Sequence, residues 1–168
     1  LSQQRWESLK PDHSRAAHIQ THLIATPHQA LVAAAALFEQ AGYTTLLLGD
    51  AIEGEAKEVA KVMAGIAHSI IQHNTPLTRP CILLSGGETS VNVKGEGQGG
   101  RNVEFLLALL CATQGRLALT ALAADTDGVD GALAVAGAYI TPQSWDKALQ
   151  LGVDPVSYLR RNDAHRFF

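Results

Sequence analysis

Charged residues are scarce in this chain of 168 residues: they make up 17% of it, and the formal net charge is only -3. A charge so close to neutral gives no electrostatic reason to expect nucleic acid or an anionic membrane as a partner. No apolar run approaches the roughly 20 residues that span a bilayer, and the polar segment 1–10 lacks the pattern of a signal peptide. The composition therefore argues against nucleic-acid and membrane partners.

Cysteine is rare as well, and Cys81 and Cys111 form no CxxC pair. Their spacing leaves a disulfide open, but both lie in apolar stretches, which favours buried, reduced thiols in a cytoplasmic protein. The sequence also has no P-loop, no HExxH zinc motif and no G-x-S-x-G nucleophile elbow, and its seven histidines show no ligand spacing. The chemistries that depend on those motifs have no support here.

Apolar residues, by contrast, make up 46% of the chain, enough to bury a sizeable core in one domain or in one domain plus the edge of another. After a polar arm over 1–20, the first half predicts a strand over 22–25, a helix over 27–40, a strand over 43–48 and a helix over 54–72. Thr26 and Gln29 form a capping box around Pro27 at the first helical position. This order of elements indicates a parallel sheet.

The second half predicts strands over 81–85, 89–94, 117–124 and 137–140, a helix over 102–113, and two short helices that open at Pro142 and Pro155. Three polar, glycine-rich segments interrupt this apolar background, and each follows a strand. In open α/β sheets, ligands bind outside the carboxyl ends of the strands. These three segments are therefore the candidate functional positions.

The first segment is Ser85-Gly86-Gly87-Glu88-Thr89. Its two glycines allow backbone N–H groups to approach an anion closely, and Glu88 could orient a substrate hydroxyl or a metal-bound water. A tight turn between two strands explains the same residues equally well.

The second segment, 95–102, is a glycine-rich loop that leads into a helix, a combination that suits phosphate or carboxylate because free N–H groups meet the positive end of the helix dipole. Arg101 would add a planar fork for an oxyanion. A flexible hairpin loop with an exposed arginine is the alternative. Gly95, Gly97 and Gly100 also match the dinucleotide fingerprint G-x-G-x-x-G, but the preceding strand alternates polar and apolar residues, unlike the buried first strand of that fold.

The third segment, 125–131, carries Asp125, Asp127 and Asp130 within six residues. Three such carboxylates repel one another unless a cation neutralises them, and Mg²⁺ with nucleotide phosphates is a natural partner because it needs only one or two protein carboxylates. Val129 and Ala136 stand where an EF-hand would need ligands. A solvated Asp-Gly turn is the alternative.

Taken together, four blocks in this order closely resemble the class II glycerate kinases, and in particular their MOFRL domain. The blocks span residues 84–89, 99–105, 125–131 and 136–138. Further similar stretches are 48–50, 53–56, Asn162-Asp163 and Phe167-Phe168. The likeness covers nearly the whole chain from about His22 onward.

The resemblance implies an α/β fold with a Rossmann-like three-layer arrangement, a mostly parallel sheet and a glycine-rich hairpin. It also implies transfer of the γ-phosphoryl group of ATP to the 2-hydroxyl of D-glycerate with Mg²⁺. Family members often carry the name hydroxypyruvate reductase, which is no independent evidence for a reductase. An NAD(P)-dependent reductase and a non-catalytic ligand-binding domain remain the alternatives.

The resemblance also implies residue roles. Arg101 would clamp an oxyanion, Glu88 and Asn102 would orient substrate, and Asp125 and Asp127 would hold Mg²⁺ or position the attacking hydroxyl. The remaining candidate contacts to substrate or nucleotide are Ser85, Gly86, Gly87, Thr89, Gly97, Gly99 and Gly100.

We expect this chain to be the C-terminal part of a two-domain enzyme, because it starts at Leu1 rather than methionine and stops at Phe168 without a closing strand. Residues 21–79 would end a Rossmann-like kinase domain, and 80–168 would form a truncated MOFRL domain. The missing parts would include the N-terminal domain with its lysine and a closing glycine- and threonine-rich segment; Val103 also replaces the usual glutamine. The chain alone should fold but be inactive, and a face left exposed could drive association, which leaves a homodimer open.

Overall fold

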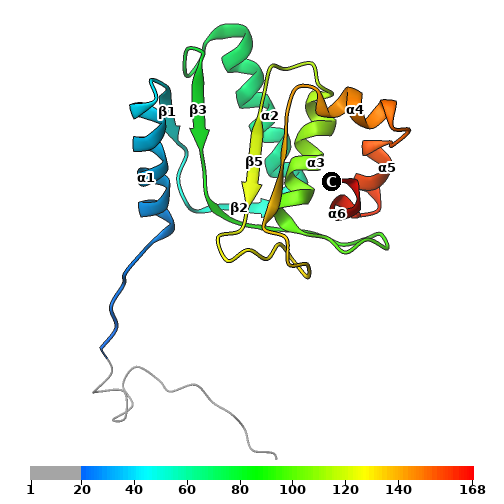
Figure 1. Ribbon diagram of the computed structural model, residues 1–168, viewed down its shortest axis with the longest axis horizontal. Coiled ribbons are helices and arrows are strands. Elements are labelled where there is room, and N and C mark those ends of the chain that lie inside the picture. The colour runs from blue at the N-terminus through cyan, green and yellow to red at the C-terminus, as the bar shows by residue number, and fades with distance from the viewer. Residues whose placement is uncertain (1–19) are drawn as a thin grey trace, which may run out of the picture.

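The computed structural model describes residues 20–168 (Figure 1). The predicted arm over 1–20 lies, except for its last residue, outside the described residues. Helix α1, Pro27–Gln40, begins as predicted: Thr26 Oγ1 accepts from Gln29 N–H at 3.1 Å, and Gln29 Oε1 accepts from Thr26 N–H at 2.9 Å. The strand expected over 22–25 is wrong, because this segment finds no strand partner and leaves Leu23 and Ile24 exposed.

The predicted parallel sheet forms, in two consecutive pieces. Strand β1, Thr44–Leu47, pairs in parallel with β3, Cys81–Leu84. The segments that follow β1 and β3 both bend, and β2, Ile52–Glu55, then pairs in parallel with β4, Gly87–Ser90. Strand β2 was not predicted. Hydrogen bonds between the two bends, such as Gly86 N–H to Gly49 O at 2.8 Å, keep the two segments side by side.

A glycine is required where the second pair begins. Gly87 adopts φ +144°, and a Cβ there would lie 2.1 Å from the carbonyl oxygen of Ile52. The segment 85–89 is therefore neither a reversing turn nor an open loop. It is the bend through which β3 passes into β4.

Helix α3, Arg101–Thr113, is the centre of the core. Leu106, Leu107 and Leu110 are fully buried on it, against α2, Ala56–His73, on one side. The antiparallel strands β5, Ala121–Ala124, and β6, Gly137–Ile140, also pack on α3. Figure 1 shows the three C-terminal helices beyond α3, which are α4, Ser144–Gln150, α5, Pro155–Arg160, and α6, Ala164–Phe167.

The α/β class is confirmed, and two of the three strand pairs in the described chain are parallel. The glycine-rich hairpin needs a correction: β4 ends at Ser90, and residues 91–100 form an irregular loop that lies against the turn after α5. Both cysteines are free as predicted, although half-buried rather than buried. None of the described helices is both long and apolar enough to cross a membrane.

Candidate functional site

Arg101, the first residue of α3, lies between two carboxylates that come from different strands. Its Nη1 is 2.6 Å from Oε1 of Glu88 in β4, and its Nη2 is 3.4 Å from both carboxylate oxygens of Asp125, which follows β5. The arginine side chain is about one-third exposed, with 35% of its surface accessible. The fold thus brings three of the predicted catalytic residues together.

Asn102 joins this group through its side chain. Its Nδ2 donates to Oδ2 of Asp125 at 2.9 Å, so Asp125 is held by both neighbours on the first turn of α3. Burial lowers the pKa of Arg101, but the negative charges of Asp125 and Glu88 outweigh that effect and raise it. The guanidinium is therefore charged at every physiological pH.

Asp130 is the residue that sequence reasoning missed. Its carboxylate is completely buried and accepts hydrogen bonds from the backbone N–H groups of Asn102, at 3.1 Å, and Val103, at 2.9 Å. The protein's own carboxylate therefore occupies the N-terminus of α3. A local capping pattern could not reveal this contact, because Asp130 lies 28 residues after Asn102.

Asp127, in contrast, makes no hydrogen bond or ion pair to this group. It is exposed, and its Oδ1 accepts from Val129 N–H at 2.9 Å, which closes a turn within the loop. No other hydrogen bond of its carboxylate occurs within residues 20–168. The same described part of the chain holds no group of three or more potential metal-ligating side chains.

Two of the glycines proposed for anion binding, Gly97 and Gly99, use their N–H groups within the protein. Gly97 N–H donates to Arg161 O at 2.9 Å, and Gly99 N–H donates to Asn162 O at 3.0 Å. The side chain of Asn162 accepts from the N–H groups of Lys94 and Gly95. These contacts explain the glycines, because a Cβ at Gly97 would lie 2.0 Å from Asn162 O.

Two buried side chains that pack behind the glycine loop, those of Asn162 and Glu104, were also not predicted to interact. Asn162 Nδ2 donates to Oε1 of Glu104 at 2.8 Å, and both side chains are buried. The other oxygen of Glu104 has no hydrogen-bond partner among residues 20–168, and burial raises the pKa of this carboxyl group. His165 Nε2 lies 3.0 Å from Asp130 O, so the C-terminal helices also support the loop that carries the aspartates.

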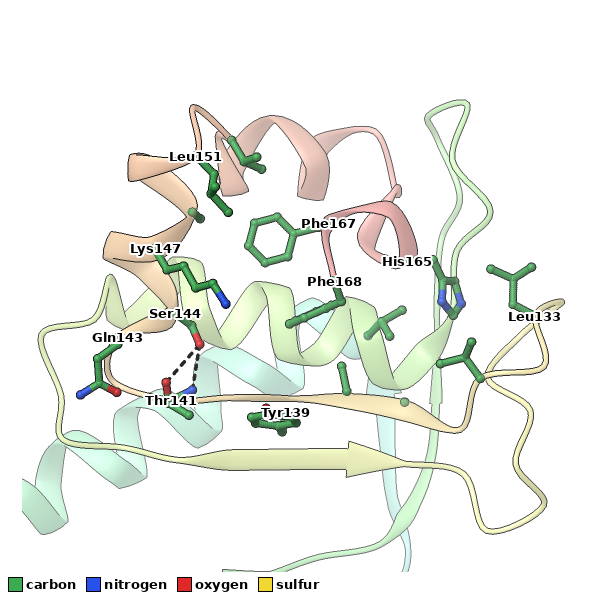
Figure 2. A pocket seen from close by; sticks show the side chains of 16 residues that line it. Leu133, Tyr139, Thr141, Gln143, Ser144, Lys147, Leu151, His165, Phe167 and Phe168 are labelled. Carbon is green, nitrogen blue, oxygen red and sulfur yellow. Dashed lines mark hydrogen bonds between the residues drawn. The ribbon is translucent and has the colours of Figure 1, made fainter.

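The remaining predicted contacts of the first segment, Ser85, Gly86, Gly87 and Thr89, lie on β4, which carries Glu88, and on the bend before it. Ser85 is exposed, Gly86 N–H is used in the ladder, and Thr89 pairs with Gly54 of β2. A cavity of about 730 Å³ lies between β6, α4 and α6 (Figure 2), and its lining includes Phe167, Phe168 and Tyr139. Arg101, Glu88 and Asp125 do not line this cavity, and the side chain of Glu88 is 80% exposed.

These features define an α/β chain whose polar site is an arginine at a helix start, flanked by carboxylates from two strand ends. The chain belongs to the MOFRL family, whose sequence profile matches residues 81–168.

Several curated relatives share this similarity over most of the chain. A protein of Agrobacterium vitis named "Putative hydroxypyruvate reductase" is 46% identical over 148 residues, which cover 87% of this chain and 34% of that protein. The D-glycerate 2-kinase of Thermotoga maritima is 32% identical, over 88% of this chain and 36% of that one. The chain thus spans about a third of the length of these relatives.

Solved structures agree with this assignment. The crystal structure of the glycerate kinase of Thermotoga maritima superposes with a TM-score of 0.84 at 31% identity, over 90% of this chain and 36% of that one. A protein of Pyrococcus horikoshii superposes with a TM-score of 0.80 at 27% identity, over 90% and 35% of the two chains.

Proposed function

We propose that this chain forms the C-terminal part of an ATP-dependent glycerate 2-kinase, which transfers a phosphoryl group to the 2-hydroxyl of D-glycerate. The single observation that carries the proposal is the position of Arg101 between Glu88 and Asp125. Phosphoryl transfer needs positioning and charge neutralisation more than covalent help, and a fixed arginine supplies both. The relatives named as glycerate kinases support the same reaction.

The charge of the site supports a divalent cation as part of the reaction. Arg101 pairs with two carboxylates, those of Glu88 and Asp125, so this group of three side chains carries an excess of negative charge, and the exposed carboxylate of Asp127 follows on the same loop as Asp125. A polyphosphate would bind there only if further positive charge came with it. Mg²⁺ fits the donor set, because it takes one or two carboxylates and keeps several waters. Asp127 would hold it, with Asp125 as the second candidate, and the ion would neutralise phosphate charge.

The chain's own residues then divide the work. Arg101 binds an oxyanion, and Glu88 fixes the guanidinium through the 2.6 Å contact. Asn102 orients Asp125. Asp127 keeps one carboxylate oxygen without a hydrogen bond to any described residue, so it could instead take the proton of the attacking hydroxyl. Gly97 and Gly99 support the loop rather than hold the ligand, since their N–H groups are used internally.

The exposure of Glu88 and the partial exposure of Arg101 support a site completed by another part of a longer protein. We propose a Rossmann-like domain on the N-terminal side, a boundary between the two near residue 80, and a catalytic cleft between them. The domain would contribute the lysine that the site lacks. A cytoplasmic location belongs to the same proposal and is supported by the two free cysteines.

A product-resolved assay tests the function. The longer polypeptide and the 168-residue chain are each incubated with D-glycerate, ATP and Mg²⁺, and parallel samples contain hydroxypyruvate with NADH or NADPH. We expect 2-phosphoglycerate from the longer polypeptide only. Arg101→Ala should lower kcat/KM by about 10²-fold or more, whereas Arg116→Ala, an exposed arginine beyond the end of α3, should not change it.

Two results would contradict the proposal. Kinase activity of the isolated chain would rule out the shared cleft. Oxidation of the nicotinamide without phosphoryl transfer would favour the reductase, for which the geometry gives little support because Gly95 and Gly97 pack against the peptide backbone at 161–163.

A further inference from the structure

A second cavity, of about 460 Å³, lies on the side of α3 that faces α2 and α5. Its apolar lining includes Ala108, Ala112 and Leu159, together with Cys111. None of the residues proposed for catalysis lines it. It is therefore separate from the arginine site.

The rim of this cavity collects cations in a chain that is acidic overall. Lys57, Lys61, Lys94 and Arg160 line it, against one carboxylate, that of Glu58. The chain as a whole has 13 lysines and arginines and 16 acidic residues, so basic side chains outnumber acidic ones at the cavity but not in the whole chain. Four basic side chains from three separate segments of the chain converge there.

Only part of that charge is neutralised within the protein. Lys57 Nζ lies 2.6 Å from Glu55, and Lys61 Nζ lies 2.8 Å from Glu58. Lys94 and Arg160 make no ion pair with any residue between 20 and 168. The hydrogen bond to Glu55 raises the pKa of Lys57, so this side chain stays charged.

The rim is also held in place rather than formed by a loose loop. Lys94 N–H donates to Oδ1 of Asn162 at 2.8 Å, and Asn162 is itself bound to Glu104. Lys57 and Lys61 lie one turn apart on α2, so their side chains share one face of the helix. A ligand would therefore meet cations whose backbone positions are already fixed.

We propose that this cavity binds a small organic anion with at least two acidic groups, phosphate or carboxylate. Lys94 and Arg160 would pair with one group, Lys57 and Lys61 would attract the other, and the apolar floor would contact the carbon atoms between them. The inference does not depend on the proposed kinase activity, because it uses none of the residues assigned to that reaction.

Cys111 provides a local reporter, because its thiol lines the cavity whereas Cys81 lies in β3. Anionic iodoacetate and neutral iodoacetamide alkylate the same thiolate. The rate with iodoacetate divided by the rate with iodoacetamide therefore reports the local electrostatic potential, and a positive potential raises this ratio. Burial, and to a lesser extent the negative charge of Asp154, raise the pKa of Cys111 to about 11, so the reaction is followed at about pH 9 by mass spectrometry of the two peptides. We expect the ratio at Cys111 to be about threefold above that at Cys81 at low salt, and equal to it in about 1 M salt.

Variants make the assignment specific. Lys94→Gln with Arg160→Gln should lower the ratio at Cys111 to that at Cys81. Arg116→Gln with Lys147→Gln, which removes two exposed cations outside the cavity, is the matched control and should leave it unchanged. Equal ratios at the two cysteines of the unmodified chain, or an equal effect of both double variants, would overturn the proposal.

Protection experiments then identify the acidic group. Alkylation of Cys111 by iodoacetamide is measured with inorganic phosphate, phosphoglycolate or succinate, and with glycerol as the neutral control. Protection by the phosphates alone assigns a phosphate ligand, and protection by succinate assigns a dicarboxylate; Arg101→Ala should change neither result. If no anion protects Cys111 more than glycerol does, the cavity is not an anion site and the proposal fails.

Discussion

The side chain of Asn162 donates from Nδ2 to Oε1 of Glu104 at 2.8 Å, and this contact ties the turn after α5 to the middle of the core. The same side chain accepts from two backbone N–H groups of the glycine loop, those of Lys94 and Gly95. One buried amide therefore joins the turn after α5 to two neighbouring segments, the glycine loop and α3, that lie 58 to 68 residues earlier in the chain. The loop that leads to Arg101 is positioned from behind by this residue.

Asn162→Ala should lower the free energy of unfolding by about 2–4 kcal/mol, because three hydrogen bonds are lost and their partners remain largely buried. Asn162 also adopts φ +54°, which alanine tolerates poorly. Chemical denaturation of the chain measures the change. Asn92→Ala, an exposed asparagine without a hydrogen bond to any described side chain, is the control and should stay within about 0.5 kcal/mol. Equal losses in the two variants would show that the amide does not hold the loop.

Glu104 should make stability depend on pH in the direction opposite to that of a salt-bridged carboxylate. Burial raises its pKa in the folded state above the ordinary value of 4.5. Folding then takes up a proton, so the free energy of unfolding decreases as the pH rises from about 4.5 through the folded pKa and is constant above it.

Glu104→Gln removes this titration and keeps the acceptor for Asn162. The variant should therefore gain stability relative to the original chain as the pH rises, and the difference should vanish below pH 4.5, where both side chains are neutral. Denaturation curves across the acid range measure the gap. Glu53→Gln, an exposed position on β2, is the control. Parallel curves for the original chain and Glu104→Gln would contradict the prediction.

Some features of the fold and of the site could be predicted from local sequence patterns. The capping box at Thr26, the parallel strands and the helix at 101–113 follow from local patterns, because caps and apolar periodicity depend on near neighbours. The meeting of Arg101, Glu88 and Asp125 is consistent with the sequence, since each lies in a polar segment that follows a predicted strand.

The contacts of the glycine loop could not be predicted in the same way. Gly95 and Gly97 look like anion-binding glycines, yet they are required by the backbone of residues 161–163, more than 60 positions away in the chain. Asp130 looks like one of three equivalent carboxylates, yet it is the cap of α3. In both cases the decisive partner is distant in sequence, and a single sequence carries no signal of such pairing.

Gly97→Ala should destabilise the chain by about 2 kcal/mol or more, because its Cβ would overlap the backbone of Asn162 and neither side can move without breaking the Gly97–Arg161 hydrogen bond. Gly65→Ala is the matched control on α2. A Cβ there meets nothing within 4 Å, so alanine should add about 0.5–1 kcal/mol of helix stability. A stable Gly97→Ala chain would reopen the anion-cradle interpretation of the loop.

The two aspartates of the third segment should separate stability from activity. Asp130→Ala leaves the N–H groups of Asn102 and Val103 without their acceptor, inside the protein, and should cost about 2–4 kcal/mol. Asp127→Ala removes an exposed carboxylate that only closes its own turn, so it should cost less than about 1 kcal/mol.

The effects on activity should have the opposite order: per folded molecule, substitution of Asp127 should lower kcat more than substitution of Asp130. In the longer polypeptide, Asp127→Ala should lower kcat by about 10²-fold or more, because the free carboxylate oxygen is the group proposed to accept the hydroxyl proton or to hold Mg²⁺. Asp130→Asn keeps one acceptor for α3 and should retain most of the kcat of the folded enzyme. Thermal denaturation and the product assay on the same preparations measure both quantities. Loss of kcat in Asp130→Asn without loss of stability would mean that the buried carboxylate, and not Asp127, takes part in the chemistry.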